Sequence, residues 1–441
     1  MNTTKTNPVL VQDQRGIALV TALIVLAVMV LAGIALARSV DTGNLAAGNL
    51  AFRQSTLQVS DLGVEKAVSH LQLLLNKKAT ETASLNYTPT YVDSPVPPGT
   101  NAIASDATGS TAYYLIERLC DAAGNCLGTP NKHYRVTTQV RGARNTESWA
   151  QAFLRQVKVP FKPDAAITTG GNLTISGNAK IKNSGTHSNG DTTVSGSASV
   201  DGTVSAGGKV TNTSSSALKT ESGAGVKAIP SVKPADFKQY AEFILARDGK
   251  VLNAAGNVLA DLSHGGQWNG WDYSVTSGTV KWQMSSNDTV DGRFYMEGDA
   301  VVSGNPGKLK PVYLPWSATL LAEGNIEIAG TPVMKSYAGG GDAVPDGVKN
   351  LLLVAGLDLK INGTLTQDQV FQGVMAAHEQ VAISGNPSLG GYIIAEDPGN
   401  RSNTAVENIV SGSMQLVSGA SVATPFTSDK PSRLAWREVE E

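Results

Sequence analysis

Few residues in this 441-residue chain have the types and spacing that a chemical site requires. The sequence contains no G-x-S-x-G nucleophile motif, no H-E-x-x-H zinc motif and no glycine-rich phosphate loop. Its five histidines are scattered, and His378-Glu379 lacks the second histidine that would complete a zinc site. We therefore expect a protein that is not an enzyme and that has no catalytic residues, no bound metal and no cofactor.

Two short stretches carry side chains that could bind a ligand. Asp342 and Asp346 lie in GGGDAVPDG, but calcium takes about six to eight oxygen ligands and the D-x-D-x-D-G pattern is missing. A solvated loop is therefore favoured over a calcium site. Trp268, Trp271 and Tyr273 in GGQWNGWDYS could stack on a sugar ring if exposed, although clustered aromatic residues are more often buried.

The cysteines of the chain are Cys120 and Cys126, in the stretch LCDAAGNCLG. Their spacing lacks the paired C-x-x-C half-sites of zinc folds, so metal binding is disfavoured. Downstream of a membrane-crossing segment they would face an oxidising compartment. That environment favours a disulfide between Cys120 and Cys126 over two free thiols.

An uncharged apolar run of 21 residues extends from Ile17 to Ala37. As a helix it would span about 31 Å, which matches the hydrocarbon core of a bilayer. The run is longer than the ~7–15 residues of a secretory signal core, although Ala35-Leu36-Ala37 fits a signal-peptidase site. We expect a single span with the short N-terminal tail in the cytoplasm, because a long C-terminal part is translocated largely regardless of its charges.

Arg15 and Gly16 lie directly against the start of this run, with no spacer. This junction resembles the cleavage site of type IV prepilins. The resemblance implies that a prepilin peptidase cuts between Gly16 and Ile17 and methylates the new N-terminus at Ile17, so that residues 1–16 are a leader. A mature helix that begins inside the membrane could then be extracted and packed against copies of itself.

The residues beyond the span extend this resemblance. The runs RS, AGNL and FRQ follow one another at 38–39, 47–50 and 52–54. Their order is similar to the N-terminal region of PilX-type minor pilins, over about residues 15–68. The resemblance implies a structural, non-enzymatic minor pilin that takes part in type IV pilus assembly. Its partners would be other minor and major pilins, the prepilin peptidase and the inner membrane.

One position departs from the major pilins of this family. Most carry a glutamate at the fifth mature position, where it pairs with the N-terminal amine of a neighbour, and here that position is Thr21. PilX-like subunits and the K-type minor pseudopilins of type II secretion often lack this glutamate and lie at or near the filament tip. Thr21 therefore favours a tip-associated subunit, and both a pilus and a secretion pseudopilus stay open as its machine.

The elements that follow predict an α+β fold. A helix is expected over residues 17–80, first apolar and then amphipathic, because leucine and alanine recur at helical spacing in its second half. Strands are expected at 111–119, 133–140 and 147–157, where β-branched and aromatic residues are enriched. Residues 81–163 would then form a small antiparallel, pilin-like sheet packed on the helix.

Residues 164–441 have a different pattern, in which a short alternating strand repeatedly ends in glycine. Examples are GNLTISGN, GDAVVSGN, GNIEIAG, GLDLKING and EQVAISGN, and the last four copies close at Gly304, Gly330, Gly363 and Gly385. Separations of 26, 33 and 22 residues are irregular but near the repeat lengths of solenoids. We expect an irregular β-helix with glycine or asparagine in left-handed corner conformations, and a β-sandwich is the alternative.

One helix is expected within this β-rich part, over residues 234–248. Pro234 at its start and Gly249 just past its end fit the usual helix boundaries. Its apolar face would comprise Phe237, Tyr240, Ala241, Ile244 and Leu245.

The bulk composition and the repeats limit the function further. A net charge of −2 gives no basic excess, so no nucleic-acid partner is expected. The alternative to an assembly subunit is a membrane-anchored surface adhesin, in which residues 164–441 bind a carbohydrate or another surface ligand. A polysaccharide lyase or hydrolase is disfavoured because the repeats show no ladder of carboxylates. We expect the chain in the inner membrane before assembly, and in the periplasm or the extracellular pilus afterwards.

Overall fold

The computed structural model describes most of the chain, in eight segments. They cover residues 14–77, 111–119, 132–141, 147–307, 315–367, 373–398, 408–419 and 422–439. Cys120 and Cys126 lie outside these residues, so the disulfide stays a prediction.

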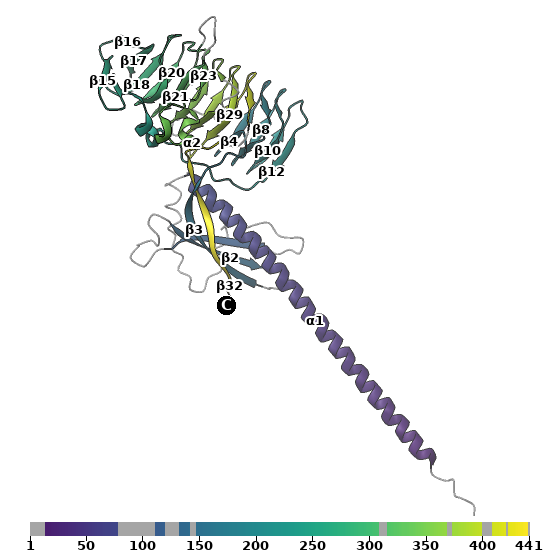
Figure 1. Cartoon of the computed structure of the whole chain (residues 1–441). Helices are drawn as coiled ribbons and strands as arrows, with labels where there is room; N and C mark the ends of the chain where they lie inside the picture. The colour runs from purple at the N-terminus through teal and green to yellow at the C-terminus, as the bar shows by residue number, and fades with distance from the viewer. Residues whose placement is uncertain are drawn as a thin grey trace, which may run out of the picture.

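A single helix of 64 residues, α1 (Gln14–Lys77), forms the N-terminal part (Figure 1). Gly33, Gly43 and Gly48 lie within it without interrupting it, and a Cβ at any of them would meet no atom within 4 Å. The first half of α1 is exposed along its length, whereas its second half buries one face on a small sheet. The predicted long helix, apolar first and then amphipathic, is confirmed.

The small sheet has four antiparallel strands. Three of them are β1 (Thr111–Arg118), β2 (His133–Arg141) and β3 (Glu147–Pro160), which form where β-branched and aromatic residues predicted strands. Their inward residues pack against Val64, Ala67 and Leu71 of α1 in one buried cluster with Leu74 and Leu75. Ser60 and Thr138 add a buried hydrogen bond of 2.8 Å between helix and sheet.

The fourth strand comes from the other end of the chain. Strand β32 (Thr427–Val439) pairs antiparallel with β3 along its whole length, and Phe161 N donates to Phe426 O just beyond the last pair (Figure 1). Strand β3 would otherwise present a long unpaired edge, which β32 covers. The expected C-terminal unit 164–441 is therefore wrong at its end. The large β-rich part is an insertion between β3 and β32 that leaves and returns at one place.

The large part contains three ladders of parallel strands. The first ladder contains β13 (Phe243–Leu245), β19 (Gly292–Met296), β21 (Trp316–Ala322), β24 (Leu351–Ala355), β27 (Gly373–Ala377), β29 (Ser388–Ala395), β4 (Ile167–Thr169), β7 (Thr186–Ser188), β10 (Thr203–Ala206) and β12 (Lys219–Ser222). The second contains β18 (Thr279–Met284), β20 (Asp299–Val302), β22 (Ile326–Ile328), β25 (Leu359–Ile361), β28 (Val381–Ile383), β30 (Asn408–Val410), β5 (Leu173–Ile175), β8 (Thr192–Val194) and β11 (Val210–Asn212). The third contains β23 (Val333–Lys335), β26 (Thr366–Gln367), the start of β29, β31 (Gln415–Val417), β6 (Lys180–Lys182) and β9 (Ser199–Val200).

The order of strands in the ladders differs from their order in the chain. The chain enters at β4 and winds through β12, and it then crosses to the far end and winds back from β13. Its last set of strands, β29, β30 and β31, pairs with the first set, β4, β5 and β6. We call this junction the seam. In Figure 1, β29 accordingly lies beside β4.

The hydrophobic core lies between the ladders. The short strands β5, β22, β25 and β28 each bury their first and third residues, as the predicted alternation requires. At the far end, β14 (Lys250–Asn253), β15 (Val258–Asp261), β16 (Gln267–Trp268) and β17 (Trp271–Thr276) form antiparallel hairpins. The short helices η4 (Gly341–Ala343) and α2 (Asp346–Lys349) lie in the connection between β23 and β24.

The helix expected over residues 234–248 does not form. Only a 3₁₀ helix, η3 (Pro234–Tyr240), is present, and the next residues form β13. Strand β13 pairs with β19 and β14, so ladder hydrogen bonds outweigh the helical spacing of the apolar residues. Phe237 and Ala241, two residues of the expected apolar face, are nevertheless buried in a cluster that includes Phe426.

The closing glycines form a column along one corner of the ladders. A Cβ on Gly385 would collide with Gly363 O, one on Gly363 with Gly330 O, and one on Gly330 with Gly304 O. None of these four has the expected left-handed backbone; among the neighbours in the column, Gly177, Gly196 and Gly412 do. Close approach of successive turns, rather than positive φ, therefore requires glycine at the four positions.

A ladder of polar side chains follows a second corner. Asp299 Oδ1 accepts from Asn325 N at 2.8 Å, and Asn325 Oδ1 accepts from Asp358 N at 3.2 Å. Backbone N–H groups also donate to side-chain oxygens of a neighbouring turn in four further pairs: Gln380 N to Asp358 Oδ1, Val381 N to Asn408 Oδ1, Asp191 N to Asn172 Oδ1 and Lys209 N to Asp191 Oδ1. Each side chain thus satisfies a corner N–H that the strand hydrogen bonds leave unpaired.

Candidate functional site

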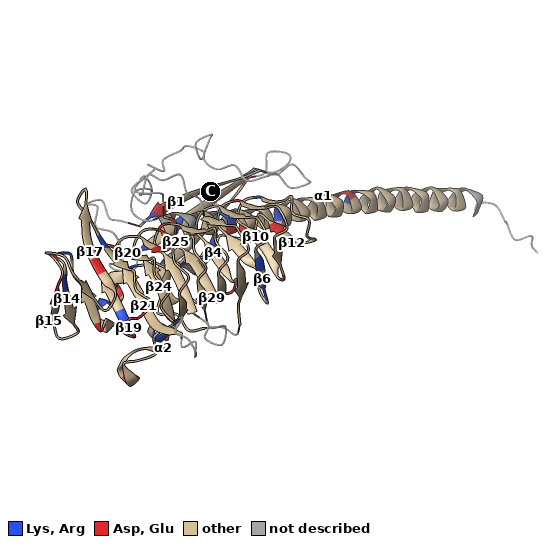
Figure 2. Ribbon diagram, turned by 90° about the horizontal axis from the view of Figure 1, so that it is seen from above, with Lys and Arg blue, Asp and Glu red and all other residues tan. Residues whose placement is uncertain are grey.

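The exposed half of α1 is the first candidate site. The segment from Ile17 to Ala37 is uncharged, and its large side chains are exposed; Ile17 and Leu31, for example, are each 66% exposed. Helix α1 is the described helix that is long and apolar enough to cross a membrane. This length of α1 is tan in Figure 2, where charged residues are blue or red. Apolar surface of this extent needs a membrane or other apolar helices to cover it.

The predicted processing site lies within this helix. Helix α1 begins at Gln14, so the peptide bond between Gly16 and Ile17 is part of its first turn. Cleavage and methylation at this bond stay predictions.

Thr21 is satisfied within its own helix. Its hydroxyl lies 2.9 Å from Ile17 O and 3.0 Å from Ala18 O, to which it can donate. A threonine in an apolar helix commonly hydrogen-bonds in this way to the preceding turn. A carboxylate at the same place could not donate to these carbonyls and would need a partner from outside. Thr21 needs no such partner.

The C-terminal end of α1 holds the large β part. Asn76 Nδ2 donates to Lys227 O at 2.8 Å, and Asn76 Oδ1 accepts from Ile229 N at 3.2 Å. Gln72 Nε2 donates to the backbone oxygen of Asp429 at 2.8 Å, where β32 returns to the small sheet. The inserted part is therefore fixed beyond the end of α1 that lies away from the apolar half (Figure 1).

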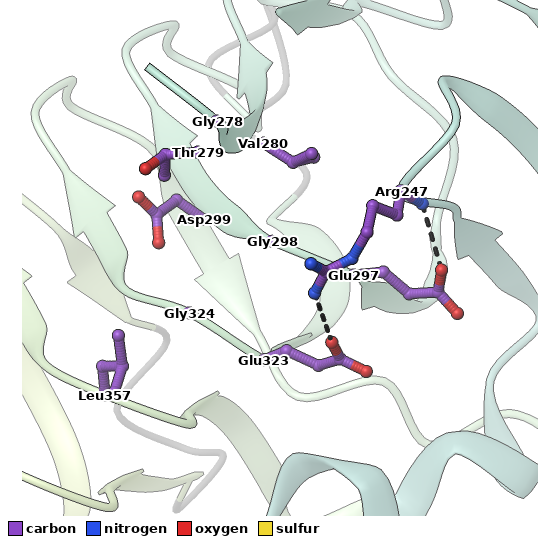
Figure 3. Close-up of a pocket in the computed structure, with 10 residues that line it drawn as sticks. All are labelled: Arg247, Gly278, Thr279, Val280, Glu297, Gly298, Asp299, Glu323, Gly324 and Leu357. Atoms are coloured by element: carbon purple, nitrogen blue, oxygen red, sulfur yellow. Dashed lines mark hydrogen bonds and ion pairs between the residues drawn. The ribbon is translucent and has the colours of Figure 1, made fainter. Parts of the chain in front are cut away.

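A cleft on the large β part is the second candidate site. It has a volume of about 270 Å³ and lies where the first ladder turns into the second, next to Arg247 (Figure 3). We call it the Arg247 cleft. Its lining residues are Arg247, Gly278, Thr279, Val280, Glu297, Gly298, Asp299, Glu323, Gly324 and Leu357. Its lining combines charged and polar side chains with apolar surface, and glycine backbone lies between its walls.

Hydrogen bonds fix the charged groups of the cleft from behind. Arg247 Nη2 lies 3.4 Å from Glu323 Oε2, and Tyr295 donates to Glu323 Oε1 at 2.6 Å. Burial, and then the contact with Glu323, raise the pKa of Tyr295, so it stays a donor. Glu297 accepts from Lys238 Nζ at 2.6 Å and from Arg247 N at 3.0 Å. Burial alone would raise the pKa of Glu297, but these donors outweigh it and lower that pKa.

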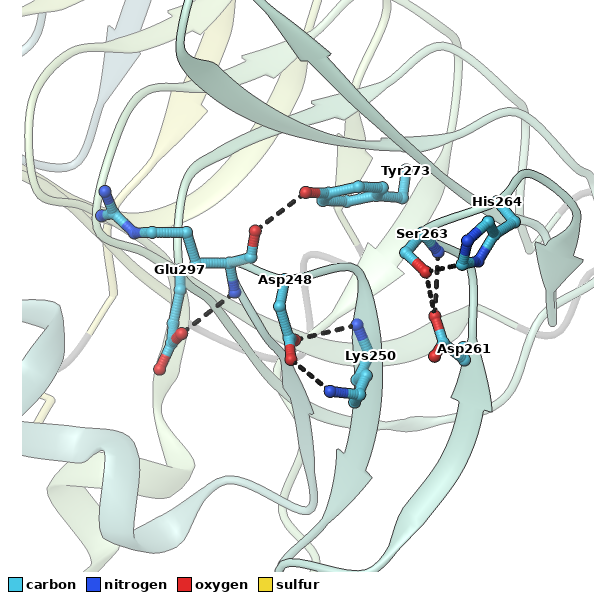
Figure 4. Close-up of polar contacts among 8 residues, drawn as sticks. Asp248, Lys250, Asp261, Ser263, His264, Tyr273 and Glu297 are labelled. Atoms are coloured by element: carbon cyan, nitrogen blue, oxygen red, sulfur yellow. Dashed lines mark hydrogen bonds and ion pairs between the residues drawn. The ribbon is translucent and has the colours of Figure 1, made fainter.

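The hairpins behind the cleft hold the backbone of Arg247. Tyr273 donates to Arg247 O at 2.8 Å, and Arg247 N donates to Glu297 at 3.0 Å. Figure 4 labels Tyr273 and Glu297, each with a dashed line for its contact. Nearby, Lys250 Nζ lies 2.6 Å from Asp248 Oδ2 and lowers the pKa of that carboxyl. Both Asp248 and Lys250 are largely exposed, so we assign this pair little stabilisation.

The three aromatic residues considered as a sugar platform belong to the hydrophobic core or pack against it. Trp271 is fully buried, with Phe294 and Trp316 as its aromatic neighbours. Trp268 packs on Phe243, and Tyr273 packs on Trp282. Burial excludes Trp271 from a stacking platform, in line with the favoured expectation, whereas Trp268 and Tyr273 are half-buried.

Asp342 and Asp346 are the carboxylates that were considered as calcium ligands. Asp342 and Asp346 are both exposed, and Asp346 Oδ1 pairs with Lys349 at 3.3 Å. Within the described ranges, no group of three or more His, Cys, Asp or Glu residues could hold a metal ion. Histidines take structural roles: His378 pairs with Glu396 at 2.7 Å, and His187 lies between Ser205 and Asn189.

The Arg247 cleft is not among the sites predicted from the sequence, although the sequence contains a signal for it. Glu297-Gly298-Asp299 and Glu323-Gly324-Asn325 repeat the order acid, glycine, Asx directly after a buried strand. Two strands that pair in parallel place such residues at the same corner. The glycine spacing predicts the turns of the ladders, and the acids that precede each glycine are the additional signal for the cleft.

Comparisons with known proteins add little to this description. No protein-family model and no curated relative matches the chain. The solved structure of the competence-associated pilin ComZ from Thermus thermophilus is similar at 12% identity and a TM-score of 0.30, over 88% of this chain and 97% of that chain. At that TM-score the likeness does not establish a common fold.

Proposed function

We propose that this chain is a non-enzymatic, pilin-like structural subunit of the PilX type that takes part in type IV pilus assembly. The observation that carries the proposal is helix α1. The first half of α1 exposes an uncharged apolar surface, and its second half packs on an antiparallel sheet. A helix of this design can rest in a membrane and later pack against the helices of other pilins, which cover the same surface.

The Gly16–Ile17 junction supports processing by a prepilin peptidase. Removal of residues 1–16 takes Lys5, Asp13 and Arg15 away and leaves a helix that begins with an apolar residue. Before assembly the chain would be anchored in the inner membrane with its N-terminus in the cytoplasm. After assembly its sheet and its large β part would lie in the periplasm or on the extracellular pilus.

A position at or near the filament tip has two supports. Thr21 satisfies its hydroxyl within α1 and offers no carboxylate to the N-terminus of a neighbour. The large β part is fixed beyond the C-terminal end of α1 by Asn76 and Gln72. In a filament of parallel, staggered helices, this mass would obstruct a subunit placed directly above, and only the top of the filament leaves that space open.

We also infer that the three ladders wind as an irregular β-helix, which serves as the displayed domain. Parallel pairing of each strand with the strand one turn away supports this architecture. A sandwich of hairpins would require antiparallel strand pairs, and among the described strands of the large part these occur only in the end hairpins.

The N-terminal sequence of the protein extracted from membranes tests this function. A chain that begins at a methylated Ile17 supports it, whereas an intact Met1 or a start at Ser39 contradicts it. The variant Gly16→Asp should retain the leader. Gly33→Ala, a change elsewhere in the same helix that meets no atom within 4 Å, should be processed normally. Loss of pili or loss of secretion on deletion distinguishes a pilus subunit from a K-type pseudopilin.

A further inference from the structure

We propose that the Arg247 cleft binds a neutral carbohydrate, with one sugar ring lying across the glycine backbone between two polar walls. The proposal concerns the displayed β part and stands independently of N-terminal processing. It rests on the polar groups that line the cleft and not on Trp268, Trp271 or Tyr273.

The geometry of the cleft sets the size of its ligand. Thr279 and Asp299 form one wall, and Arg247 and Glu323 form the other, as Figure 3 shows. A volume of about 270 Å³ lies near the lower end of ligand pockets, which are typically about 300–1,000 Å³. The Arg247 side chain is 69% exposed, so the site opens to solvent. One ring can occupy the cleft while the rest of an oligosaccharide lies outside.

The glycines make the floor accessible. Gly324 N donates to Gly298 O at 3.0 Å, so the two residues lie on successive turns of the ladders. A Cβ at Gly298 would collide with Val280 O at 2.5 Å, and one at Gly324 would collide with the Asp299 carboxylate. The bare backbone lets a flat ligand approach closely.

The charges disfavour an anionic ligand, and the donors and acceptors beside them suit a neutral, hydroxyl-bearing one. The acids Glu297, Asp299 and Glu323 repel an anion, while Arg247 and Lys238 already pair with Glu323 and Glu297. A sugar hydroxyl both donates and accepts, so it suits a cleft that offers a guanidinium donor beside carboxylate and hydroxyl acceptors. An apolar ligand would meet chiefly Val280 and Leu357. A hydroxyl-rich ring can therefore use both the donor and the acceptors of the cleft.

The polar groups are also held in place before a ligand arrives. Glu323 is oriented by the buried Tyr295 hydroxyl at 2.6 Å, and Glu297 by Lys238 Nζ at 2.6 Å. Tyr273 fixes the backbone oxygen of Arg247. Side chains that are ordered in advance lose little conformational entropy on binding, which favours the weak polar contacts that sugars make.

An array of neutral and acidic oligosaccharides, probed with the full chain in a detergent without a sugar headgroup, tests the proposal. The neutral members should contain glucose, galactose, mannose and N-acetylglucosamine. We expect retention on neutral members, and a dissociation constant raised about tenfold or more by Arg247→Ala, which removes the guanidinium donor. Thr279→Arg, at an exposed position, should obstruct the cleft and abolish retention.

The matched control is Glu327→Gln, on the neighbouring strand β22 and outside the cleft, which should bind as the unchanged chain does. Fluorescence of the buried Trp271 and Trp282 reports whether each variant is folded. Failure to retain any neutral oligosaccharide overturns the proposal, as does preferential binding of acidic ones. Equal binding by folded Arg247→Ala and Thr279→Arg would also overturn it, and so would binding of calcium alone at these residues. None of these results affects processing at Gly16.

Discussion

Asn408 Nδ2 donates a hydrogen bond to the backbone oxygen of Asn172 at 3.0 Å, although the two residues lie 236 positions apart in the chain. The same amide donates to Asp397 Oδ2 at 2.8 Å, and its oxygen accepts from Val381 N at 3.1 Å. One nearly buried side chain thus joins three turns of the ladders at the seam. At the seam the first strands of the inserted part, β4, β5 and β6, pair with its last strands, β29, β30 and β31.

Replacing this side chain should weaken the seam. In Asn408→Ala, Val381 N, Asn172 O and Asp397 lose a partner, and each buried polar group left unpaired costs about 1–3 kcal/mol. We expect a loss of about 3 kcal/mol in the free energy of unfolding of the β part. Denaturant titration followed by tryptophan fluorescence measures it. Asn362→Ala, whose hydrogen bonds are exposed, should lose under about 1 kcal/mol, and equal losses would contradict the seam.

The stability of the seam should also depend on pH. Burial raises the pKa of Asp397, and the nearby Glu379 and Asp358 raise it further against the hydrogen bond from Asn408. Because the folded pKa lies above the unfolded value of about 3.9, the stability is fully present below that pH and falls as pH rises through the folded pKa. Asp397→Asn should therefore be more stable at neutral pH, and this pH-dependent gain should disappear below about pH 4.

Thermal unfolding at a series of pH values measures the difference. Asp397 has a positive φ of 47°, which asparagine tolerates well, so a constant offset at all pH values is expected in addition. The exposed Asp288→Asn serves as the control and should show no such pH-dependent gain. A difference between Asp397→Asn and the unchanged chain that is the same at pH 4 and pH 7 would reject the effect of the buried charge.

The glycine column provides a steric test. In Gly363→Ala the new Cβ would collide with Gly330 O, a backbone atom that cannot move without shifting the next turn. Overpacking of this kind costs about 1–3 kcal/mol, and here the backbone must also separate. Gly225→Ala meets no atom within 4 Å and should leave the melting temperature unchanged. If both variants melt alike, the column does not limit the spacing of the turns.

Several elements were predictable because their signals are local. Helix α1 follows from one apolar run and one amphipathic run, and β1, β2 and β3 follow from β-branched and aromatic residues. The positions of Gly304, Gly330, Gly363 and Gly385 predicted repeated turns, and these glycines do stack. Their backbone conformation was predicted wrongly, because spacing alone does not distinguish a left-handed turn from a close approach of two chains.

The errors concern pairing between distant residues. Strand β32 contains Lys430, Pro431 and Arg433, and its sequence gives no sign that its partner is β3, more than 250 residues earlier. The spacing of Phe237 and Ile244 is helical, yet Ile244 lies in strand β13, which pairs with β19. The Arg247 cleft depends in the same way on which strands are neighbours, so its residues could be recognised only once the ladders were known.

The junction between α1 and the β part should respond to a single side chain. Asn76 is nearly buried and supplies a donor to Lys227 O and an acceptor to Ile229 N. In Asn76→Ala both contacts are lost, so we expect faster hydrogen exchange at Ile229, roughly tenfold for a loss of about 1.4 kcal/mol. Hydrogen exchange with mass spectrometry measures it. Gln58→Ala, at an exposed position of the same helix, is the control, and unchanged exchange at Ile229 in Asn76→Ala would show that Asn76 does not hold this segment.

Removal of β32 tests whether the large β part is an insertion. A chain that ends before Thr427 loses the strand that covers the edge of β3 from Trp149 to Pro160, and it loses the contact of Gln72 with Asp429. Because an uncovered edge exposes unpaired backbone groups and promotes aggregation, we expect rapid proteolysis within β1–β3 and association of the chain. Removal of residues 440–441 alone is the control and should have little effect. If residues 164–441 were instead a separate terminal unit, the truncation would leave β1–β3 resistant to protease and would destabilise the ladders, and that result would contradict the pairing of β3 with β32.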